Sequence, residues 1–474
     1  MTIKLYNTLT RKLEEFKPLV PGHVGFYSCG PTVYHYTHLG NLRTFLHNDF
    51  LKRMFLANGY DVRHIMNITD VGHLTNDEDD SGEDKMEKGA ARDNKSVWDI
   101  ARFYKDEFMR DFNDLNMIAP TVMPHATDYI AEQIELVQKL QDLGYTYEIP
   151  NDGIYYDTSK FAGYGALTGG SLSGNRAGAR VGFNDAKRNP TDFALWKFSP
   201  TDVKRQMEWD SPWGVGFPGW HAECSAMSMK LLGNHFDIHT GGEDLSRVHH
   251  ANEIAQSEPI TGAPWVNTWL HYSFLLDKSG EKMAKSKGEF LGLESVRKRG
   301  YDPMVYRYFV ALGHYQSQLA FSWETMDASA NGYANLVRRV ADLIVANDGT
   351  VDSVAYDAWH EKMLAAMSDN LKTAAVLVHV QDFIKSNEIN GATKLALVRF
   401  ADDLLGLQFI DRAQKLVDLE RESAPAEIIA LAESRATAKA NRDWATADAL
   451  RAEIDAAGWT VLDGKDGYKI VKKA

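Results

Sequence analysis

Residues 24–68 read VGFYSCGPTVYHYTHLGNLRTFLHNDFLKRMFLANGYDVRHIMNI, and this stretch decides the fold class. Val24 to Ser28 is a short apolar run typical of a buried strand, and Val62 to Ile68 is a second such run. Between them, apolar residues recur at helical spacing from Leu39 to Met54, and Gly59 follows as a helix stop. A strand, a helix and a strand in this order predict a βαβ unit with parallel strands and a right-handed crossover.

The chain that follows extends this unit into an α/β domain of residues 1–320. We expect two helices, at about 96–113 and 127–143, and later a helix over 221–232 and a strand over 236–239. Ligands of such folds bind beyond the carboxyl ends of the strands, beside a helix N-terminus, where Cys29 and the turn after it lie.

An insertion interrupts this domain. Between about 145 and 212 the pattern changes: Asn151-Asp-Gly153 indicates a hairpin, and residues 163–182 are rich in Gly and Ser. We interpret this stretch as an inserted subdomain and place the whole insertion at about 120–212.

Beyond residue 320 the pattern becomes helical. Apolar residues at helical spacing predict a helical bundle over 321–421, and Glu422-Ser-Ala-Pro425 is a candidate linker. Two short helices and a terminal hairpin then predict a small mixed α+β domain of residues 425–474. The acidic run at 77–84 is most simply a solvated loop.

Composition limits the function classes. The 474 residues include 44% hydrophobic and 25% charged residues, which is ordinary for a globular chain, and the formal net charge is −13. This charge argues against a surface coated with positive charge for nucleic acid, although it leaves room for a local basic face. The first residues show no secretory signal and no run is long enough to span a bilayer, so we expect a cytoplasmic protein without membrane contact.

The two cysteines occur in contexts that indicate metal ligation. Cys29 ends the first predicted strand, and Cys224 lies in a predicted helix 195 positions later. His249 and Glu253 are four apart, so they share a helix face. Two thiolates, an imidazole and a carboxylate form a plausible tetrahedral Zn²⁺ set. The alternatives are two buried hydrophobic cysteines or a disulfide, and a reducing cytosol disfavours the disulfide.

Two further motifs occur about 240 residues apart: His38-Leu-Gly-Asn41 at a helix start, and Lys282-Met-Ala-Lys-Ser286. Together they resemble the two ATP signatures of class I aminoacyl-tRNA synthetases, and with the cysteine, histidine and glutamate set the chain resembles the cysteinyl-tRNA synthetases. The resemblance covers nearly the whole chain in the family's order. The matching segments are residues 29–34, 38–41, 67–70, 211–214, 218–227, 233–239, 241–244, 249–253 and 282–286, and residues 444–451 resemble the family's anticodon-binding segment.

The resemblance implies a Rossmann-like catalytic domain that ligates L-cysteine to tRNA(Cys) through a cysteinyl-adenylate. It assigns Cys29, Cys224, His249 and Glu253 as ligands of one Zn²⁺, which would select the thiolate of cysteine over serine; His250 is the nearest rival of His249. It also places Thr69 and Trp220 around the amino acid.

For ATP, carried with Mg²⁺, the resemblance implies that His38 and Asn41 line the phosphates. Lys282 and Lys285 would stabilise charge on pyrophosphate, and Gly241, Gly242 and Asp244 would lie near the adenosine. Two departures from the family pattern, Ala284 in the lysine loop and Ser246-Arg-Val248 before the histidine pair, affect none of these groups.

For tRNA, the bundle at 321–421 is expected to contact the nucleic acid and the domain at 425–474 to bind the anticodon. Trp444 and Asp448 lie four apart and could stack on a base and accept its hydrogen bonds, although Trp444 could instead pack the small domain. We expect a monomer. Two alternatives are a cysteine:amino-sugar ligase of the mycothiol type, which lacks a tRNA-reading tail, and a non-catalytic RNA-binding paralogue.

Overall fold

The computed structural model describes residues 1–72, 74–76, 81–168, 186–200, 204–277, 280, 290–346, 349–421, 424–464 and 467–473. The chain forms two compact units. The first contains Met1–Ala330, Glu361–Leu377 and Asp403–Gly406, and the second contains Asn331–His360, Val378–Asp402 and Leu407–Ala474.

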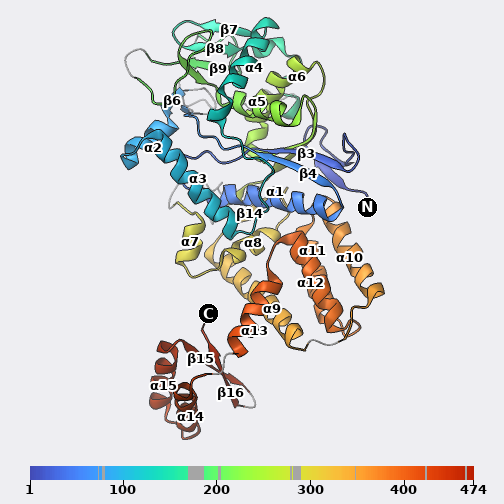
Figure 1. The fold of residues 1–474 in the computed structure, drawn as a ribbon, viewed down its shortest axis with the longest axis vertical. Coiled ribbons are helices and arrows are strands. Elements are labelled where there is room, and N and C mark those ends of the chain that lie inside the picture. The colour runs from blue at the N-terminus through green and yellow to red at the C-terminus, as the bar shows by residue number, and fades with distance from the viewer. Residues whose placement is uncertain are drawn as a thin grey trace. The chain divides into compact units, whose positions relative to one another are not determined.

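A four-stranded parallel sheet forms the centre of the first unit (Figure 1). Its order is β12-β11-β3-β4, and every neighbouring pair is parallel. The strands are β3 (His23–Ser28), β4 (Asp61–Met66), β11 (Phe236–Gly242) and β12 (Val266–Tyr272). From β3 the chain passes to β4 on one side, whereas β11 and β12 are added on the other side. The strand order therefore reverses between β3 and β11, and in open α/β sheets ligands bind outside the carboxyl ends at such a point.

The predicted βαβ unit is confirmed. Helix α1 (Leu39–Ala57) connects β3 to β4, and Gly59 follows it with φ +80°, a conformation that favours glycine. The helix is more buried than its apolar stripe predicts, because its polar residues also lie inside the unit. Arg43 is 1% exposed and donates to the carbonyls of Phe274 and Ser317 at 2.7 and 2.6 Å.

The insertion contains an antiparallel sheet of order β10-β9-β8-β7. The predicted hairpin is confirmed: β7 (Thr146–Ile149) and β8 (Gly153–Tyr156) pair around Asn151, which has φ 60°. Strands β9 (Phe193–Phe198) and β10 (Gly216–Pro218) complete the sheet and were not predicted. Of the Gly- and Ser-rich stretch at 163–182, residues 169–182 lie outside the described residues.

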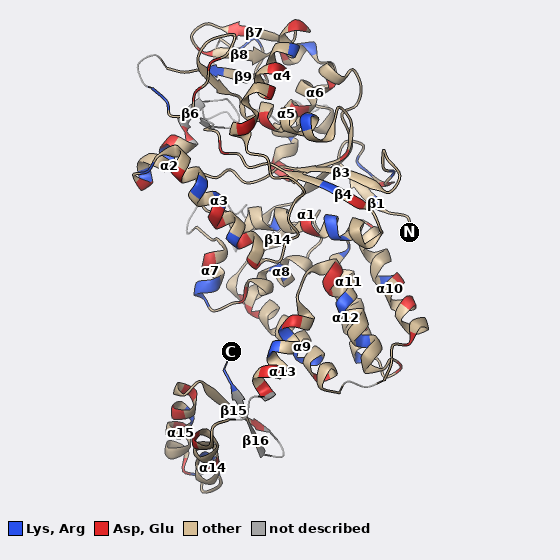
Figure 2. Ribbon diagram, in the orientation of Figure 1, with Lys and Arg blue, Asp and Glu red and all other residues tan. Residues whose placement is uncertain are grey.

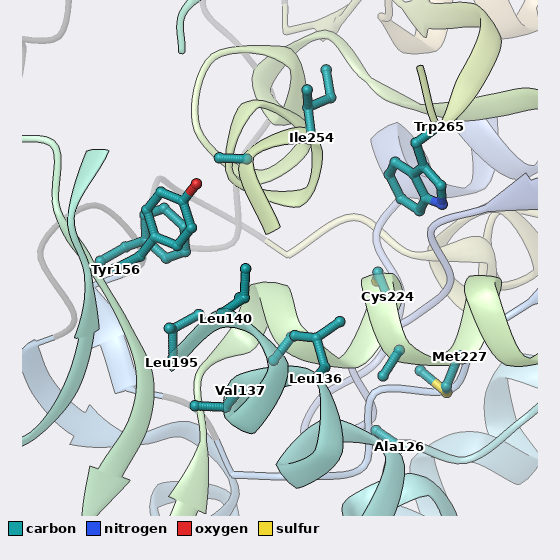
Figure 3. Packing of buried hydrophobic residues seen from close by; sticks show 14 of the residues in the cluster. Ala126, Leu136, Val137, Leu140, Tyr156, Leu195, Cys224, Met227, Ile254 and Trp265 are labelled. Carbon is teal, nitrogen blue, oxygen red and sulfur yellow. The ribbon is translucent and has the colours of Figure 1, made fainter. Parts of the chain in front are cut away.

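Buried side chains join this sheet to helices α4 (Ile130–Asp142), α5 (Trp220–Leu232) and α6 (His249–Thr261). Figure 3 shows Leu136, Val137 and Leu140 of α4 between Leu195 of β9 and Met227 of α5. The predicted helices at 127–143 and 221–232 are thus confirmed, the first beginning with a 3₁₀ turn at Ala126–Tyr129. This packing places Cys224 of α5 in the same buried cluster as Ile254 of α6.

We predicted a solvated loop for the acidic run at 77–84, and this prediction is wrong for its second half. Residues 77–80 lie outside the described residues, but Ser81–Asp84 forms strand β6, which pairs with β5 (Leu74–Asn76). Asp84 is 7% exposed, caps helix α2 (Lys85–Asp93) and forms an ion pair with Arg205. The loop prediction failed here because a distant arginine neutralises a carboxylate that looks solvated in sequence.

The remaining elements are mainly helical, as predicted beyond residue 320. Before that point lie β1 (Lys4–Asn7), β2 (Lys12–Glu15), α3 (Val97–Asp114), β13 (Leu275–Leu276), α7 (Leu293–Lys298), α8 (Pro303–Ala311) and β14 (Leu319–Ala320). After it come α9 (Trp323–Ala346), α10 (Ser353–Ser368), α11 (Thr373–Lys385), α12 (Gly391–Leu405) and α13 (Phe409–Arg421). Figure 2 shows acidic and basic residues interspersed along the helices. Within the described ranges, no helix combines the length and apolar character that a bilayer crossing requires.

The last part of the chain contains the two predicted helices, α14 (Ala426–Ala440) and α15 (Trp444–Ala456), and the predicted hairpin of β15 (Trp459–Gly464) and β16 (Gly467–Lys472). Its small core contains Ile428, Ala432, Ile454, Trp459 and Val461. Arg435 donates to both carboxylate oxygens of Asp463, at 3.0 and 2.9 Å, and so ties α14 to the hairpin.

Candidate active site and metal centre

The largest concentration of predicted site residues lies at the point where the strand order reverses. Cys29 follows β3 directly, and its N–H donates to the carbonyl of Thr240 in β11 at 3.2 Å. A pocket opens beyond these strand ends. Its lining comes from residues 29–34, 37–45, 67–69, the start of α5, residues 242–249 and residues 272–275.

Glycine at position 30 allows β3 and β4 to approach each other at this pocket. A Cβ on Gly30 would lie 1.6 Å from the carbonyl oxygen of Asn67, so no other residue fits without displacing the backbone. The N–H of Gly30 donates to Asn67 Oδ1 at 2.8 Å. The ends of the two strands are therefore held together directly beside Cys29.

Four predicted ligands converge beside the pocket. One donor atom each from Cys29, Cys224, His249 and Glu253 lies within 4.8 Å of the other three. They come from the turn after β3, from α5 and from the first turns of α6, and packing of these elements brings together residues 195 positions apart. A second set, which shares Cys29 and Glu253 with the first, includes His239 and His250.

The carboxylate of Glu253 fits a metal ligand. Glu253 is fully buried, and its Oε2 accepts a hydrogen bond from His239 Nε2 at 2.9 Å. No hydrogen bond to its buried Oε1 is found within the part of the chain that the structure describes, although His249 Nε2 lies 2.9 Å away. The lone pairs of His249 Nε2 and Glu253 Oε1 approach each other without forming an aligned hydrogen bond. This arrangement is expected where both atoms are ligands of one cation. Two sulfurs, one imidazole and one carboxylate suit Zn²⁺.

A layer of buried histidines surrounds these four residues. His221 Nδ1 lies 2.8 Å from His249 Nδ1, and His250 Nδ1 lies 2.8 Å from His271 Nε2. His250 Nε2 also lies 3.3 Å from Cys29 Sγ. His249 belongs to the set that contains both cysteines, and its Nε2 lies 2.9 Å from Glu253 Oε1. His250 belongs to the set that contains only Cys29 of the two, and its Nε2 lies 3.9 Å from the same oxygen. Histidine ligands usually share their other ring nitrogen with such a neighbour, which orients the ring.

Burial and mutual charge shift the pKa values of the four groups. Burial alone would raise the pKa of Cys29, but hydrogen bonds with Cys224 and His249 lower it to about 6. Burial and the neighbouring Cys29 raise the pKa of Cys224. Burial would lower the pKa of His249, but Glu253 and Cys29 raise it to about 10. Burial would raise the pKa of Glu253, but His239 and His249 lower it to about 2. Without a metal, Cys29 and Glu253 are therefore negatively charged, and Cys224 and His249 keep their protons. A bound cation would displace these two protons.

The predicted amino-acid contacts line the same pocket. Thr69 follows β4, and its hydroxyl donates to Glu223 Oε1 at 2.6 Å. The ring of Trp220, the first residue of α5, lies 4.4 Å from the ring of His249, centroid to centroid. Glu223 also lines the pocket, and our sequence reasoning missed it, although it lies between the predicted residues Trp220 and Cys224.

The N-terminus of α1 forms another wall of the pocket. His38 is the N-cap residue, and its Nδ1 accepts a hydrogen bond from the N–H of Asn41 at 3.2 Å, which leaves Nε2 to carry the ring proton. A Cβ on Gly40 would lie 2.9 Å from the His38 ring, so the glycine makes room for the imidazole. A helix N-terminus with a neighbouring N–H donor suits a phosphate group.

The lysine motif lies outside the described residues, which exclude positions 281–289 and with them Lys282, Ala284 and Lys285. The residues that follow it return to α1: the N–H of Leu39 donates to the carbonyl of Leu291 at 2.9 Å, and His38 pairs with Gly292 in a β-bridge. Leu291 and Gly292 thus lie at the N-terminal end of α1.

Of the three residues predicted near the adenosine, two line the pocket and one does not. Gly242 and Asp244 line the pocket. Gly241 is not among the lining residues; a Cβ there would lie 2.7 Å from both the His250 ring and the Leu245 side chain. Gly241 therefore allows close packing of the histidine layer against the end of β11.

At the other end of the chain, Trp444 is 59% exposed at the first position of α15, and Asp448 is exposed one turn later. Trp459, which is 7% exposed, packs the core of this domain instead. Trp444 therefore lies at the surface and is not part of that core.

Comparisons with known proteins agree with the motifs. Residues 15–331 match the family described as the tRNA synthetases class I (C) catalytic domain. "Cysteine--tRNA ligase 1" of Burkholderia lata is 46% identical over 471 residues, which cover 99% of this chain and 97% of that protein. "Cysteine--tRNA ligase" of Treponema denticola is 44% identical over 498 residues and covers all of both chains. A solved Mycobacterium tuberculosis methionyl-tRNA synthetase in complex with methionyl-adenylate has a similar fold, with a TM-score of 0.57 at 16% identity, over 85% of this chain and 94% of that one.

Proposed function

The chain belongs to the cysteine–tRNA ligases, which are class I aminoacyl-tRNA synthetases, and from this membership we propose that it selects cysteine with a Zn²⁺ ion and activates it as cysteinyl-adenylate. The observation that carries the proposal is the convergence of Cys29, Cys224, His249 and Glu253 within 4.8 Å, beside a pocket that also reaches the N-terminus of α1. One pocket thus combines a thiol-binding centre and a phosphate-binding helix end.

The metal centre would serve discrimination against serine. A selectivity of about 10⁴ between cysteine and serine requires roughly 5–6 kcal/mol, more than the shape of a pocket supplies for two such similar side chains. A bound Zn²⁺ favours a thiolate ligand over an alcohol. Cys29, Cys224, His249 and Glu253 would hold the ion, and His221 and His239 would orient the His249 ring and the Glu253 carboxylate.

In the activation step, a carboxylate oxygen of cysteine attacks the α-phosphorus of ATP and pyrophosphate leaves. Such a reaction depends on positioning and charge neutralisation. His38 and Asn41 would hold the phosphates at the N-terminus of α1, with Mg²⁺ on ATP. Lys282 and Lys285 would stabilise charge on the leaving pyrophosphate. The adenosine would lie against Gly242 and Asp244, with Gly241 behind them.

In the transfer step, the terminal ribose hydroxyl of the tRNA attacks the adenylate. We assign activation to the catalytic domain of residues 1–320, contact with the tRNA to the bundle at 321–421 and anticodon binding to residues 425–474. The exposed Trp444 and Asp448 support a stacking and hydrogen-bonding surface on α15. The named relatives match the chain over its whole length, including this last domain, which favours the tRNA ligase over an amino-sugar ligase or a non-catalytic paralogue.

X-ray absorption at the zinc edge tests the proposal. Cysteine should add one sulfur to those that surround zinc in the free enzyme, whereas serine should add none. Cys29→Ser and Cys224→Ser should each lose zinc and cysteine-dependent pyrophosphate exchange together, without a gain in serine activation. An unchanged sulfur count on addition of cysteine would show that the metal is structural and that selectivity arises elsewhere.

A further inference from the structure

Glu223 is a carboxylate in the wall of the active-site pocket to which the function above assigns no role. The residue is 0% exposed and lies on α5, between Trp220 and the ligand Cys224. Burial of a carboxylate costs several kcal/mol unless hydrogen bonds and charge offset the lost hydration. Its contacts therefore indicate what the carboxylate serves.

The hydrogen bond to Thr69 has only one possible direction. A carboxylate can only accept, so Thr69 donates its single hydroxyl proton to Glu223 Oε1, at 2.6 Å. Asn67 Nδ2 in turn donates to Thr69 Oγ1 at 3.0 Å. The orientation of the Asn67 amide follows from its other end, because Oδ1 accepts the N–H of Gly30.

Thr69 is therefore left as an acceptor. Its proton is used on Glu223 and one lone pair is used on Asn67, so the hydroxyl can present only its second lone pair to the pocket that it lines. A group that binds there must donate a hydrogen bond. A carboxylate ligand would meet an acceptor and the negative charge of Glu223 behind it.

The charge around this position favours a cation. Two thiolates and the Glu253 carboxylate outweigh the two positive charges of a bound Zn²⁺, so the metal centre itself is negative, and Glu223 adds to that charge on the adjacent wall. The amino-acid substrate carries one cation, its α-ammonium group. Its thiol is expected at the metal centre and its carboxylate toward α1, which leaves the third substituent of the α-carbon to be held.

We propose that Glu223 is a positioning residue for the α-ammonium group of the substrate: it holds Thr69 as a hydrogen-bond acceptor and supplies the opposing charge. This inference rests on the proposed function and adds a third point of attachment to it. Glu223 thereby orients the amino acid so that its carboxylate faces the nucleotide.

The inference is tested by comparing the binding of two ligands to the wild type and to a Glu223 variant. The ligands are L-cysteine and 3-mercaptopropionate, which keeps the thiol and the carboxylate but lacks the ammonium group. Their dissociation constants are measured by calorimetry on zinc-loaded wild type and on Glu223→Gln. Loss of a hydrogen-bonded charge contact predicts weaker binding of cysteine by about 10- to 100-fold in the variant. Binding of 3-mercaptopropionate should change by less than about threefold, and zinc should stay at about one per chain.

Two threonine variants approach the same contact from the other side. Thr69→Ser keeps the hydroxyl and should bind cysteine nearly as wild type does, whereas Thr69→Val should reproduce the selective loss seen in Glu223→Gln. This pair decides the question if Glu223→Gln fails to fold or loses zinc. Glu132→Gln is the matched control. It removes a carboxylate of α4 that pairs with Lys230 of α5 at 3.3 Å and does not line the pocket, so the binding of neither ligand should change.

In pyrophosphate exchange, Glu223→Gln should raise KM for cysteine and leave KM for ATP unchanged. Equal weakening of cysteine and 3-mercaptopropionate would overturn the inference and make Glu223 a purely structural residue, as would no weakening of either. Absence of cysteine-dependent exchange in the wild-type chain would overturn the proposed function as well, so the two failures are distinguishable.

Discussion

Replacement of Gly30 by alanine tests whether the close approach of two strand ends builds the metal centre. The added Cβ would lie 1.6 Å from the carbonyl oxygen of Asn67, and real Cβ contacts essentially never fall below 3.0 Å. The strand ends must therefore separate by at least the difference, 1.4 Å. The atom in the way is a backbone oxygen, so no side chain can rotate to relieve the contact.

This displacement is large on the scale of the chemistry. Metal–ligand distances tolerate about 0.2 Å, and Cys29 is covalently next to Gly30. Misplacement of reacting groups by about 1 Å costs roughly 10² in rate, or about 2.7 kcal/mol of transition-state stabilisation. Gly30→Ala should therefore bind zinc at least tenfold more weakly and lose about 100-fold in kcat/KM for cysteine. Competition with a chelator and pyrophosphate exchange measure the two effects.

Gly25→Ala is the matched control. Gly25 lies on the same strand, and a Cβ there would make only ordinary contacts, at 3.5 Å or more, with Phe236, Asp237 and Leu232. This variant should retain zinc and activity within about threefold of wild type, as expected for a tolerated change. If Gly30→Ala also retained its zinc and its rate, the close approach of β3 and β4 would not be required for the site, and the reasoning would be refuted.

Three further predictions concern protons, stability and the C-terminal domain. Burial raises the pKa of Cys224, and Glu253 and Cys29 raise the pKa of His249 to about 10. At pH 7.5 the metal-free site therefore holds a proton on Cys224 and a proton on His249. Cys29, with a pKa of about 6, is deprotonated at this pH. Zinc should therefore release about two protons per chain in weakly buffered solution, and its affinity should fall as pH falls; binding without proton release would contradict this. Asp49→Asn should lower the free energy of unfolding by about 3–5 kcal/mol, seen as a lower Tm, because it leaves Arg307 and Arg53 buried without their carboxylate. The control Asp61→Asn removes an exposed carboxylate and should change the Tm little. Burial would raise the pKa of Asp49 but the two arginines lower it, so this stabilisation is present above pH ~3.9 and is lost as pH falls through the folded-state pKa. Truncation before Pro425 should leave cysteine-dependent pyrophosphate exchange largely intact and depress charging of tRNA(Cys); unchanged charging would exclude an anticodon-binding role for the tail.

The sequence by itself determined what depends on local spacing. The βαβ unit from Val24 to Ile68 followed from a change of hydrophobic period. The helix stop was predicted because Gly59 is a glycine, and its φ of +80° in the structure agrees with that. His249 and Glu253 could be placed on one face because a helix repeats every 3.6 residues. The His38-Leu-Gly-Asn41 motif predicted a helix start, and α1 begins there. The class I fold and the ligase family were also identified from motifs along the chain.

Only the tertiary structure decided which distant groups meet. The order β12-β11-β3-β4 places Cys29 beside β11, and nothing local to Cys29 encodes that neighbour. The hydrogen bond from His239 to Glu253 and that from Thr69 to Glu223 join residues 14 and 154 positions apart, and neither could be read from spacing. The acidic strand at Ser81–Asp84 likewise depends on Arg205. The physical reason is that a buried polar group is stable only with its partner, and the packing of whole helices and strands determines where that partner lies.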